Sequence, residues 1–162
     1  MAKRTHIIRS CDLMVSGDTG DMIVTYSLGS CLGVTIYDPV ARVGGMIHCM
    51  LPLSKTNKEK SRDKPAMFVD TGIPLLFKKA YELGAQKPRI VVKAAGCAQL
   101  MGSEGIFRVG PRNFAVFKKL LWKNDLLIDV QHIGGAVSRT ISLDVESGKT
   151  FMKLLGKESE LC

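Results

Sequence analysis

The sequence predicts a single α/β domain built on a largely antiparallel sheet, with about two long helices and hairpins at both ends. Short runs rich in valine, isoleucine, threonine and leucine alternate with turn residues in the first third of the chain and again near its end, as in strands. Between them, residues 66–83 and 111–124 carry apolar side chains at helical spacing. A chain of 162 residues that is 46% hydrophobic fits one domain, spanning residues 1–162, with a substantial core.

An antiparallel hairpin is the clearest local prediction. Two apolar runs flank Asp38–Pro39, a dipeptide that marks a reversal of the chain. If residues 38–41 form the turn, Cys31 lies directly opposite His48, with their Cβ atoms about 5 Å apart. A slip of one residue would send the two side chains to opposite faces of the sheet.

The remaining elements follow from the same signals. Residues 66–83 should form a helix that kinks near Ile73, because Gly72 and Pro74 weaken its middle. Both ends of the chain, residues 1–4 and 157–162, are expected to fray. Strands are expected within residues 5–15 and at residues 22–26, 90–95, 126–133, 140–145 and 150–155, and loops at residues 54–64 and 102–110.

Cys31 and His48 have the side chains that nucleophilic catalysis needs. A thiol is mostly protonated at neutral pH, and its thiolate is the nucleophile. A neighbouring imidazole can take the thiol proton and later return it to a leaving group. Such a pair would favour the thiolate and make Cys31 the fastest of the five cysteines to alkylate. By spacing alone, ordinary packing also places a cysteine near a histidine, and both interpretations stay open.

The residues around the cysteine can support the same chemistry. Gly29 and Ser30 form a tight turn just before it, and such a turn can aim backbone N–H groups, those near Ser30 or Leu32, at a developing oxyanion. Thr25 precedes this turn at the end of an apolar run, where its hydroxyl can fix the orientation of the His48 ring.

Two motifs resemble those of the CheD-type chemoreceptor glutamine deamidases. One is Thr-x-Ser-Leu-Gly-Ser-Cys at residues 25–31, and the other is Gly-Gly-Met-x-His-x-Met-Leu-Pro at residues 44–52, with Tyr-Asp-Pro between them. The likeness runs over most of the chain and resumes in Gly110-x-Arg112-Asn113, in Gly134-Gly135 and at Gly148.

The resemblance implies a layered α/β sandwich with the site at the edge of the sheet. It implies that Cys31 is the nucleophile, His48 the general base and Thr25 the third member of the site. Asn113 would have a structural role, bonding the backbone near the site. The family removes ammonia from glutamine side chains on the cytoplasmic helices of chemoreceptors, leaving glutamate. This chemistry uses no metal and no organic cofactor, and a CheC-like phosphatase is a further candidate partner.

Composition and charge bear on the other classes of protein to which this chain could belong. The formal charge of +8 suits an acidic protein, a membrane surface or nucleic acid. The densest basic run, residues 55–64, lacks the interleaved aromatic residues of single-strand binding, so a solvated loop or a lid over the site is favoured over nucleic acid. No apolar run approaches the roughly 20 residues of a membrane helix, and no signal-type core follows the first residues, so a cytoplasmic protein without membrane insertion is expected. Five cysteines without a C-x-x-C argue against a disulfide framework and a zinc site.

Three alternatives remain open at this point. Another thiol enzyme, such as a peptidase or a transglutaminase, would use the same Cys31 and His48. A non-enzymatic chemotaxis adaptor that binds receptors or a CheC-like phosphatase would not need the thiol. A nucleic-acid-binding protein would depend on the net charge, and its affinity would fall steeply with salt.

Overall fold

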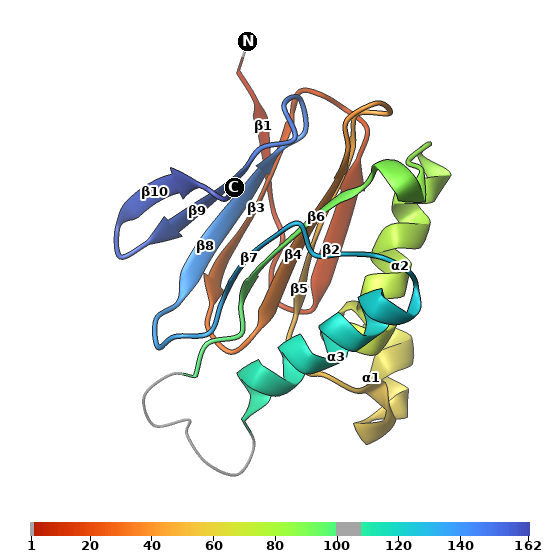
Figure 1. The fold of residues 1–162 in the computed structure, drawn as a ribbon, viewed down its shortest axis with the longest axis vertical. Helices are drawn as coiled ribbons and strands as arrows, with labels where there is room; N and C mark the ends of the chain where they lie inside the picture. Colours follow the sequence, from red (N-terminus) through yellow and green to blue (C-terminus); the bar gives the residue numbers. More distant parts are fainter. Residues whose placement is uncertain (1, 100–107) are drawn as a thin grey trace.

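The computed structural model describes residues 2–99 and 108–162, so most of the predicted loop at residues 102–110 falls outside the described residues. The described residues form two five-stranded sheets, here called sheet 1 and sheet 2 (Figure 1). Sheet 1 has the order β1 (Arg4–Ile7), β3 (Asp21–Leu28), β8 (Arg139–Asp144), β9 (Thr150–Leu154) and β10 (Lys157–Glu160). Sheet 2 has the order β2 (Asp12–Ser16), β5 (Val43–Cys49), β4 (Leu32–Asp38), β6 (Val91–Gly96) and β7 (Val130–Ile133).

The pairing is largely antiparallel, as predicted, but the strands divide between two sheets rather than forming one. Only the pairs β1–β3 and β6–β7 are parallel among the described strands. The predicted strand at residues 126–133 is shortened to β7, because the chain before it packs Leu126 and Ile128 on the core instead of pairing.

The two long helices match the prediction, although their limits shift. The first begins at Val69 rather than residue 66, because residues 65–67 form a separate 3-10 turn, and Pro74 lies inside it. The predicted loop at residues 54–64 instead holds a short helix, whose Asn57 side chain accepts a hydrogen bond from the N–H of Lys60 at 3.0 Å. The helical segments are η1 (Ser54–Thr56), α1 (Lys58–Asp63), η2 (Pro65–Met67), α2 (Val69–Glu82), η3 (Lys87–Arg89) and α3 (Val109–Lys123).

Helices and sheets form three layers, which confirms the layered sandwich (Figure 1). Helices α2 and α3 cover one face of sheet 2, and sheet 1 packs against its other face. Neighbouring side chains of β5 therefore enter different cores, because strand side chains alternate between faces. Ile47 packs with Phe77 and Phe117 of the helices, whereas Met46 packs with Ile23 and Ile141 of sheet 1.

The central hairpin differs from the prediction in its register. Its turn spans residues 39–42, and His48 lies opposite Gly33 rather than opposite Cys31. The Asp38 side chain moves the turn by one residue, since its carboxylate accepts hydrogen bonds from the N–H groups of Val40 and Ala41. The resulting shift of two positions along β4 keeps the same face, so it does not separate the thiol from the imidazole.

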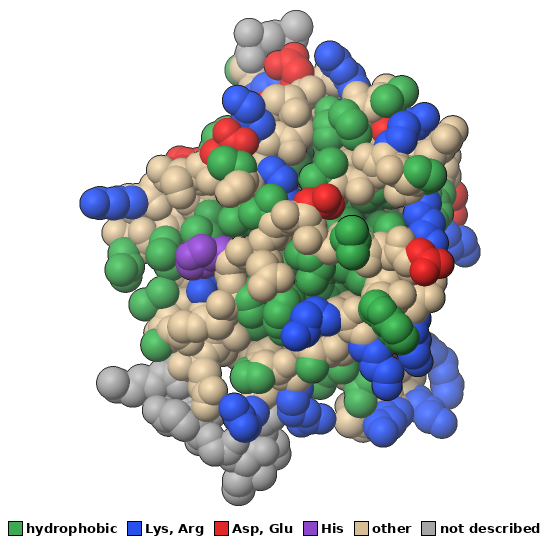
Figure 2. Space-filling view, in the orientation of Figure 1, with side chains coloured by type: hydrophobic (Ala, Val, Ile, Leu, Met, Phe, Trp, Pro, Cys, Tyr) green, Lys and Arg blue, Asp and Glu red, His purple; other side chains and the backbone are tan. Residues whose placement is uncertain are grey.

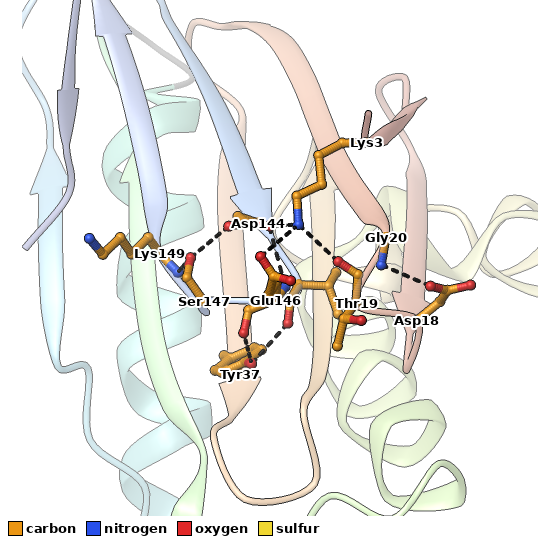
Figure 3. Close-up of polar contacts among 10 residues, drawn as sticks. Lys3, Asp18, Thr19, Gly20, Tyr37, Asp144, Glu146, Ser147 and Lys149 are labelled. Carbon is orange, nitrogen blue, oxygen red and sulfur yellow. Dashed lines mark hydrogen bonds and ion pairs between the residues drawn. The ribbon is translucent and has the colours of Figure 1, made fainter. Parts of the chain in front are cut away.

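Lys3 and Arg4 are held in place, contrary to the fraying predicted for residues 1–4, of which residue 1 lies outside the described residues. The ammonium group of Lys3 donates to the Thr19 carbonyl at 3.0 Å (Figure 3). It also pairs with the carboxylates of Asp144 and Glu146, each at 3.2 Å. These contacts fasten the start of the chain to the turn between β8 and β9.

The C-terminal segment is ordered as well, contrary to the prediction for residues 157–162. Residues 157–160 form β10 against β9. The Leu161 side chain is buried in the core of sheet 1, and its N–H donates to the Thr150 carbonyl at 2.7 Å. Among the residues that the structure describes, no helix has both the length and the apolar character that crossing a bilayer requires.

Candidate active site

A pocket of about 380 Å³ opens where the end of sheet 1 meets the end of sheet 2. It lies beside the loop of residues 29–31 between β3 and β4, here called the Cys31 loop. The pocket brings Cys31 and His48 together, as the sequence predicts, and Thr25 contacts the imidazole from its buried side. The lining residues are Ile7, Ile8, Arg9, Ser10, Tyr26, Ser27, Cys31, His48 and Met50.

A chain of two hydrogen bonds fixes the protonation of His48. The Thr25 hydroxyl donates to the Ile8 carbonyl at 2.9 Å, so its oxygen must accept in the 2.7 Å contact with Nδ1 of His48. Nδ1 therefore carries the ring proton, and Nε2 keeps its lone pair. Nε2 is buried and has no hydrogen-bond partner among the described residues, so its lone pair is free to receive a proton.

His48 is poised as a neutral base. Only 3% of its surface is exposed, and burial lowers its pKa to about 4. Burial has this effect because it disfavours the charged imidazolium. Thr25 offers a hydroxyl rather than a carboxylate, so it orients the ring without adding a negative charge that would raise the pKa.

Cys31 rests as a thiol, which corrects the prediction that His48 favours its thiolate. Burial, together with the nearby Cys11, raises the pKa of the Cys31 thiol to about 11. No hydrogen bond joins the sulfur to Nε2 of His48 in the described structure. The two groups therefore share a pocket as neutral partners, and proton transfer has to accompany attack on a substrate.

The Cys31 loop is fastened to the chain that follows β6. The carbonyl of Gly29 accepts from the N–H of Ala98 at 2.9 Å, and the carbonyl of Cys31 accepts from the N–H of Cys97 at 2.8 Å. Gly96 permits this close approach, since a Cβ there would collide with the Cys31 carbonyl. Gly96 also has a φ of +106°, in the region that favours glycine.

Asn113 joins the Cys31 loop to Met50, the residue that follows β5, the strand that carries His48. Its side-chain amide donates to the carbonyls of Ser30 at 3.0 Å and Met50 at 3.1 Å. Asn113 is fully buried at the start of α3, and its Oδ1 has no partner among the described residues. This agrees with the role in backbone bonding that the resemblance implies, and it shows which two segments are joined.

Gly29, Ser30 and Leu32, which are predicted to support an oxyanion, differ in their backbone hydrogen bonds and in their burial. Gly29 uses its N–H in a 3.0 Å hydrogen bond to the Ser27 carbonyl. Leu32 begins β4, and its side chain is fully buried. Within the described residues, the N–H groups of Ser30 and Cys31 donate to no acceptor. The N–H groups of Ser30 and Cys31 are thus the donors that this loop can offer to an oxyanion.

The other cysteines and histidines lie outside this arrangement. Burial raises the pKa of Cys49 well above its usual value and that of Cys97 to about 12, which suits small core residues. His132 accepts a hydrogen bond from Arg139 at its Nδ1, 2.9 Å away. All five cysteines are free thiols, and the described residues hold no cluster of three or more metal-binding side chains.

Comparison with known proteins places the chain in a family. The family described as CheD chemotactic sensory transduction matches residues 50–154. A probable chemoreceptor glutamine deamidase CheD 1 of Syntrophus aciditrophicus is 46% identical over 150 residues, covering 93% of this chain and 94% of the relative. Similar proteins of Solibacter usitatus and Pyrococcus horikoshii are each 40% identical, covering 96% and 85% of this chain and 92% and 85% of the relatives.

The two kinds of comparison cover different parts of the site. The family match begins at residue 50 and so includes Asn113 but not Thr25, Cys31 or His48. The alignment with the Syntrophus protein takes in 150 of the 162 residues and therefore reaches across all of these positions. Since the family match covers well over half of the chain and the relatives cover most of it at 40% to 46% identity, this chain belongs to the CheD family.

Proposed function

We propose that this protein hydrolyses the side-chain amide of specific chemoreceptor glutamines to glutamate, with Cys31 as nucleophile and His48 as base. The observation that carries the proposal is the hydrogen bond from Nδ1 of His48 to Thr25, because it leaves Nε2 as a proton acceptor in the pocket that holds Cys31. The names of the related proteins, each a probable chemoreceptor glutamine deamidase, support the choice of substrate.

The first half of the reaction forms a thioester. As the sulfur of Cys31 attacks the amide carbon, its proton passes to Nε2 of His48, and the carbonyl oxygen becomes an oxyanion. When the tetrahedral intermediate collapses, the imidazolium returns that proton to the departing nitrogen. The C–N bond breaks, ammonia leaves, and the glutamyl group remains bound to sulfur.

The second half releases glutamate. A water molecule gives a proton to Nε2 of His48 while its oxygen attacks the thioester carbon. The new intermediate expels the sulfur, which recovers the proton as a thiol. Throughout both halves, Thr25 keeps Nδ1 protonated, so the same nitrogen of the ring, Nε2, exchanges protons at each step.

The oxyanion would be stabilised by the N–H groups of Ser30 and Cys31. Backbone donors held in fixed positions stabilise developing charge because they need no reorganisation during the reaction. Asn113 supports this arrangement, since it fixes the Ser30 carbonyl and so the orientation of the peptide unit that follows it.

The physiological partners follow from the substrate. The target glutamines would lie on cytoplasmic helices of receptors, and the protein would act in the cytoplasm. A CheC-like phosphatase, proposed on the family resemblance, would be a regulator that binds the enzyme.

The decisive experiment incubates a chemoreceptor cytoplasmic fragment with the protein and maps its peptides by mass spectrometry. We expect glutamines to become glutamates with the wild type and with Cys162→Ala, an exposed cysteine outside the site, but not with Cys31→Ala. Cleaved peptides would indicate a peptidase instead. Receptor binding without any change in mass, equal for the wild type and Cys31→Ala, would indicate an adaptor and overturn the proposal.

A further inference from the structure

The outer rim of the active-site pocket carries two exposed apolar side chains. Ile7 is 58% exposed and Tyr26 is 51% exposed, and both line the pocket that contains Cys31. The parallel register of β1 and β3 sets Ile7 opposite Val24, which brings Tyr26, two residues further along β3, to the same end of this strand pair. Single exposed apolar residues are common, but an adjacent pair beside a nucleophile forms a surface that a partner can cover.

The charge around this rim is positive. Arg9 is exposed and lines the pocket, whose nine lining residues include no aspartate or glutamate. Figure 2 shows lysine and arginine side chains gathered at the lower right, where Figure 1 draws α1. The exposed basic residues of this helix and its C-terminal cap are Lys58, Lys60, Arg62 and Lys64.

Part of this basic surface reaches the neighbourhood of the site. Cys11 donates its N–H to the His48 carbonyl at 2.8 Å, which places it next to the base. Burial raises the pKa of the Cys11 thiol, and the charges of Lys64 and Lys60 oppose that rise. Asp12 next to Cys11 and Glu59 and Asp63 of α1 are exposed as well, so the positive charge at the pocket lining itself comes from Arg9.

We propose that Ile7 and Tyr26 bind the apolar side of an amphipathic receptor helix and that Arg9 pairs with a carboxylate close to the target glutamine. This inference rests on the proposed function and names the surface that selects its substrate. A helix presents side chains three and four residues apart on one face, so apolar and acidic residues beside a glutamine can reach the rim together. The acidic character of the partner follows from the net charge of +8 and the absence of acidic residues from the lining.

Kinetics on two substrates separate docking from chemistry. On a receptor cytoplasmic fragment, Tyr26→Ala and Ile7→Ser should each raise KM by roughly ten- to hundredfold and leave kcat near the wild-type value, because they remove binding remote from the reacting atoms. On a short uncharged glutamine peptide, which cannot span the rim, both variants should lose much less than on the receptor fragment. Val40→Ala and Leu127→Ala, exposed apolar positions that do not line the pocket, are the matched controls.

The charged part of the surface has its own test. Arg9→Glu should raise KM for the receptor fragment. It should also remove the part of the salt dependence of KM that arises because salt screens the charge of Arg9. A fragment whose carboxylates beside the glutamine are replaced by lysine should favour Arg9→Glu over the wild type. Lys123→Glu, an exposed change at the end of α3 away from the pocket lining, should have neither effect.

The outcomes distinguish this inference from the proposed function. If the wild type deamidates the fragment and Cys31→Ala does not, but the Ile7, Tyr26 and Arg9 variants keep a wild-type KM, the docking surface is wrong and the chemistry stands. Equal losses on the fragment and on the short peptide would also overturn docking, because they would show damage to the catalytic groups. If Cys31→Ala retains activity, the proposed function itself fails.

Discussion

Nδ1 of His48 donates to the Thr25 hydroxyl at 2.7 Å, while that hydroxyl donates to the Ile8 carbonyl at 2.9 Å. A hydroxyl in this position fixes the tautomer of the base but contributes no formal charge. Burial therefore controls the proton affinity of the ring, and it lowers the pKa of His48 to about 4. The site begins as a thiol beside a neutral imidazole, and charge appears only during the reaction.

Removing the Thr25 hydroxyl should impair catalysis more than folding. Thr25→Val keeps the shape of the side chain but loses the acceptor for Nδ1, so the ring can turn or exchange tautomers. We expect kcat on the receptor fragment to fall about a hundredfold, the scale of a small misplacement of a reacting group. Thr25→Ser, which retains the hydroxyl, should recover most of the rate. Equal activity of the two variants would show that the hydroxyl does not position the base.

The alkylation of Cys31 should be slow at neutral pH. Because its pKa is raised to about 11, only a small fraction is thiolate at pH 7, and that fraction grows about tenfold per pH unit below the pKa. Iodoacetamide labelling followed by peptide mass spectrometry should show Cys31 reacting no faster than the exposed Cys162 at pH 7, with a rate that climbs through pH 9. Rapid labelling that stays constant below pH 8 would instead reveal a preformed ion pair.

Local patterns in the sequence predicted much of the site. The alternation around Thr25 and the turn at Gly29–Ser30 indicate a strand that ends in a sharp bend, and the structure has β3 followed by the Cys31 loop. The family resemblance singled out Cys31 and His48, and the two line one pocket. Their catalytic roles remain predictions until the variants are measured.

Other features depend on contacts between distant parts of the chain, which a local pattern does not contain. The division into two sheets arises because β3 pairs with β8 while β4 pairs with β6. The hairpin register depends on Asp38, whose carboxylate binds nearby backbone N–H groups and also the Arg89 side chain at 3.0 Å. The order of the C-terminal tail depends on the burial of Leu161, a lone apolar residue among charged ones.

Replacing His48 should change both the rate and the pH dependence of stability. His48→Gln removes the proposed general base, so the rate should fall by roughly two to four powers of ten. The pKa of His48 lies near 4 in the folded protein, against an ordinary value of 6.5, so protons bind the unfolded chain first. The contribution of neutral His48 to the free energy of unfolding is fully present above pH 6.5. As the pH falls toward 4, up to about 3 kcal/mol of this free energy is lost.

Urea unfolding of the two proteins at several pH values measures that contribution. The difference in unfolding free energy between the wild type and His48→Gln should shift in favour of the variant as the pH falls from 7 to 4. Carboxylates common to both proteins cancel in the comparison. A difference that is constant over this range would mean that His48 is not held neutral by burial.

Two glycines with the same backbone preference provide a test of how the Cys31 loop is held in place. Gly96 and Gly134 both have positive φ, at +106° and +91°, so alanine is strained at either position. At Gly134 an added Cβ meets nothing within 4 Å, whereas at Gly96 it collides with the Cys31 carbonyl. Gly96→Ala should therefore lose much more activity and stability than Gly134→Ala, measured by deamidation and by urea unfolding. Similar losses would show that backbone strain alone accounts for the effect.

Asn113 is expected to act on the rate by holding the Cys31 loop to Met50, the residue that follows β5. Asn113→Ala removes the donors to the Ser30 and Met50 carbonyls, so the loop can shift relative to His48. We expect kcat to fall about a hundredfold, while KM for the receptor fragment changes little, because the outer rim of the pocket is untouched. Asn124→Ala is the matched control, since its amide caps the exposed Leu120 carbonyl at the far end of the same helix.

Stability measurements separate the positioning role of Asn113 from simple damage to the fold. The variant leaves two carbonyls without these donors, so its unfolding free energy should fall by about 1–3 kcal/mol. Activity is then compared at a temperature where the wild type and Asn113→Ala are both fully folded. If kcat is unchanged under those conditions, Asn113 stabilises the protein without positioning Cys31. If kcat falls while alkylation of Cys31 by iodoacetamide keeps its pH dependence, the loss lies in the alignment of the thiol with the base rather than in its ionisation.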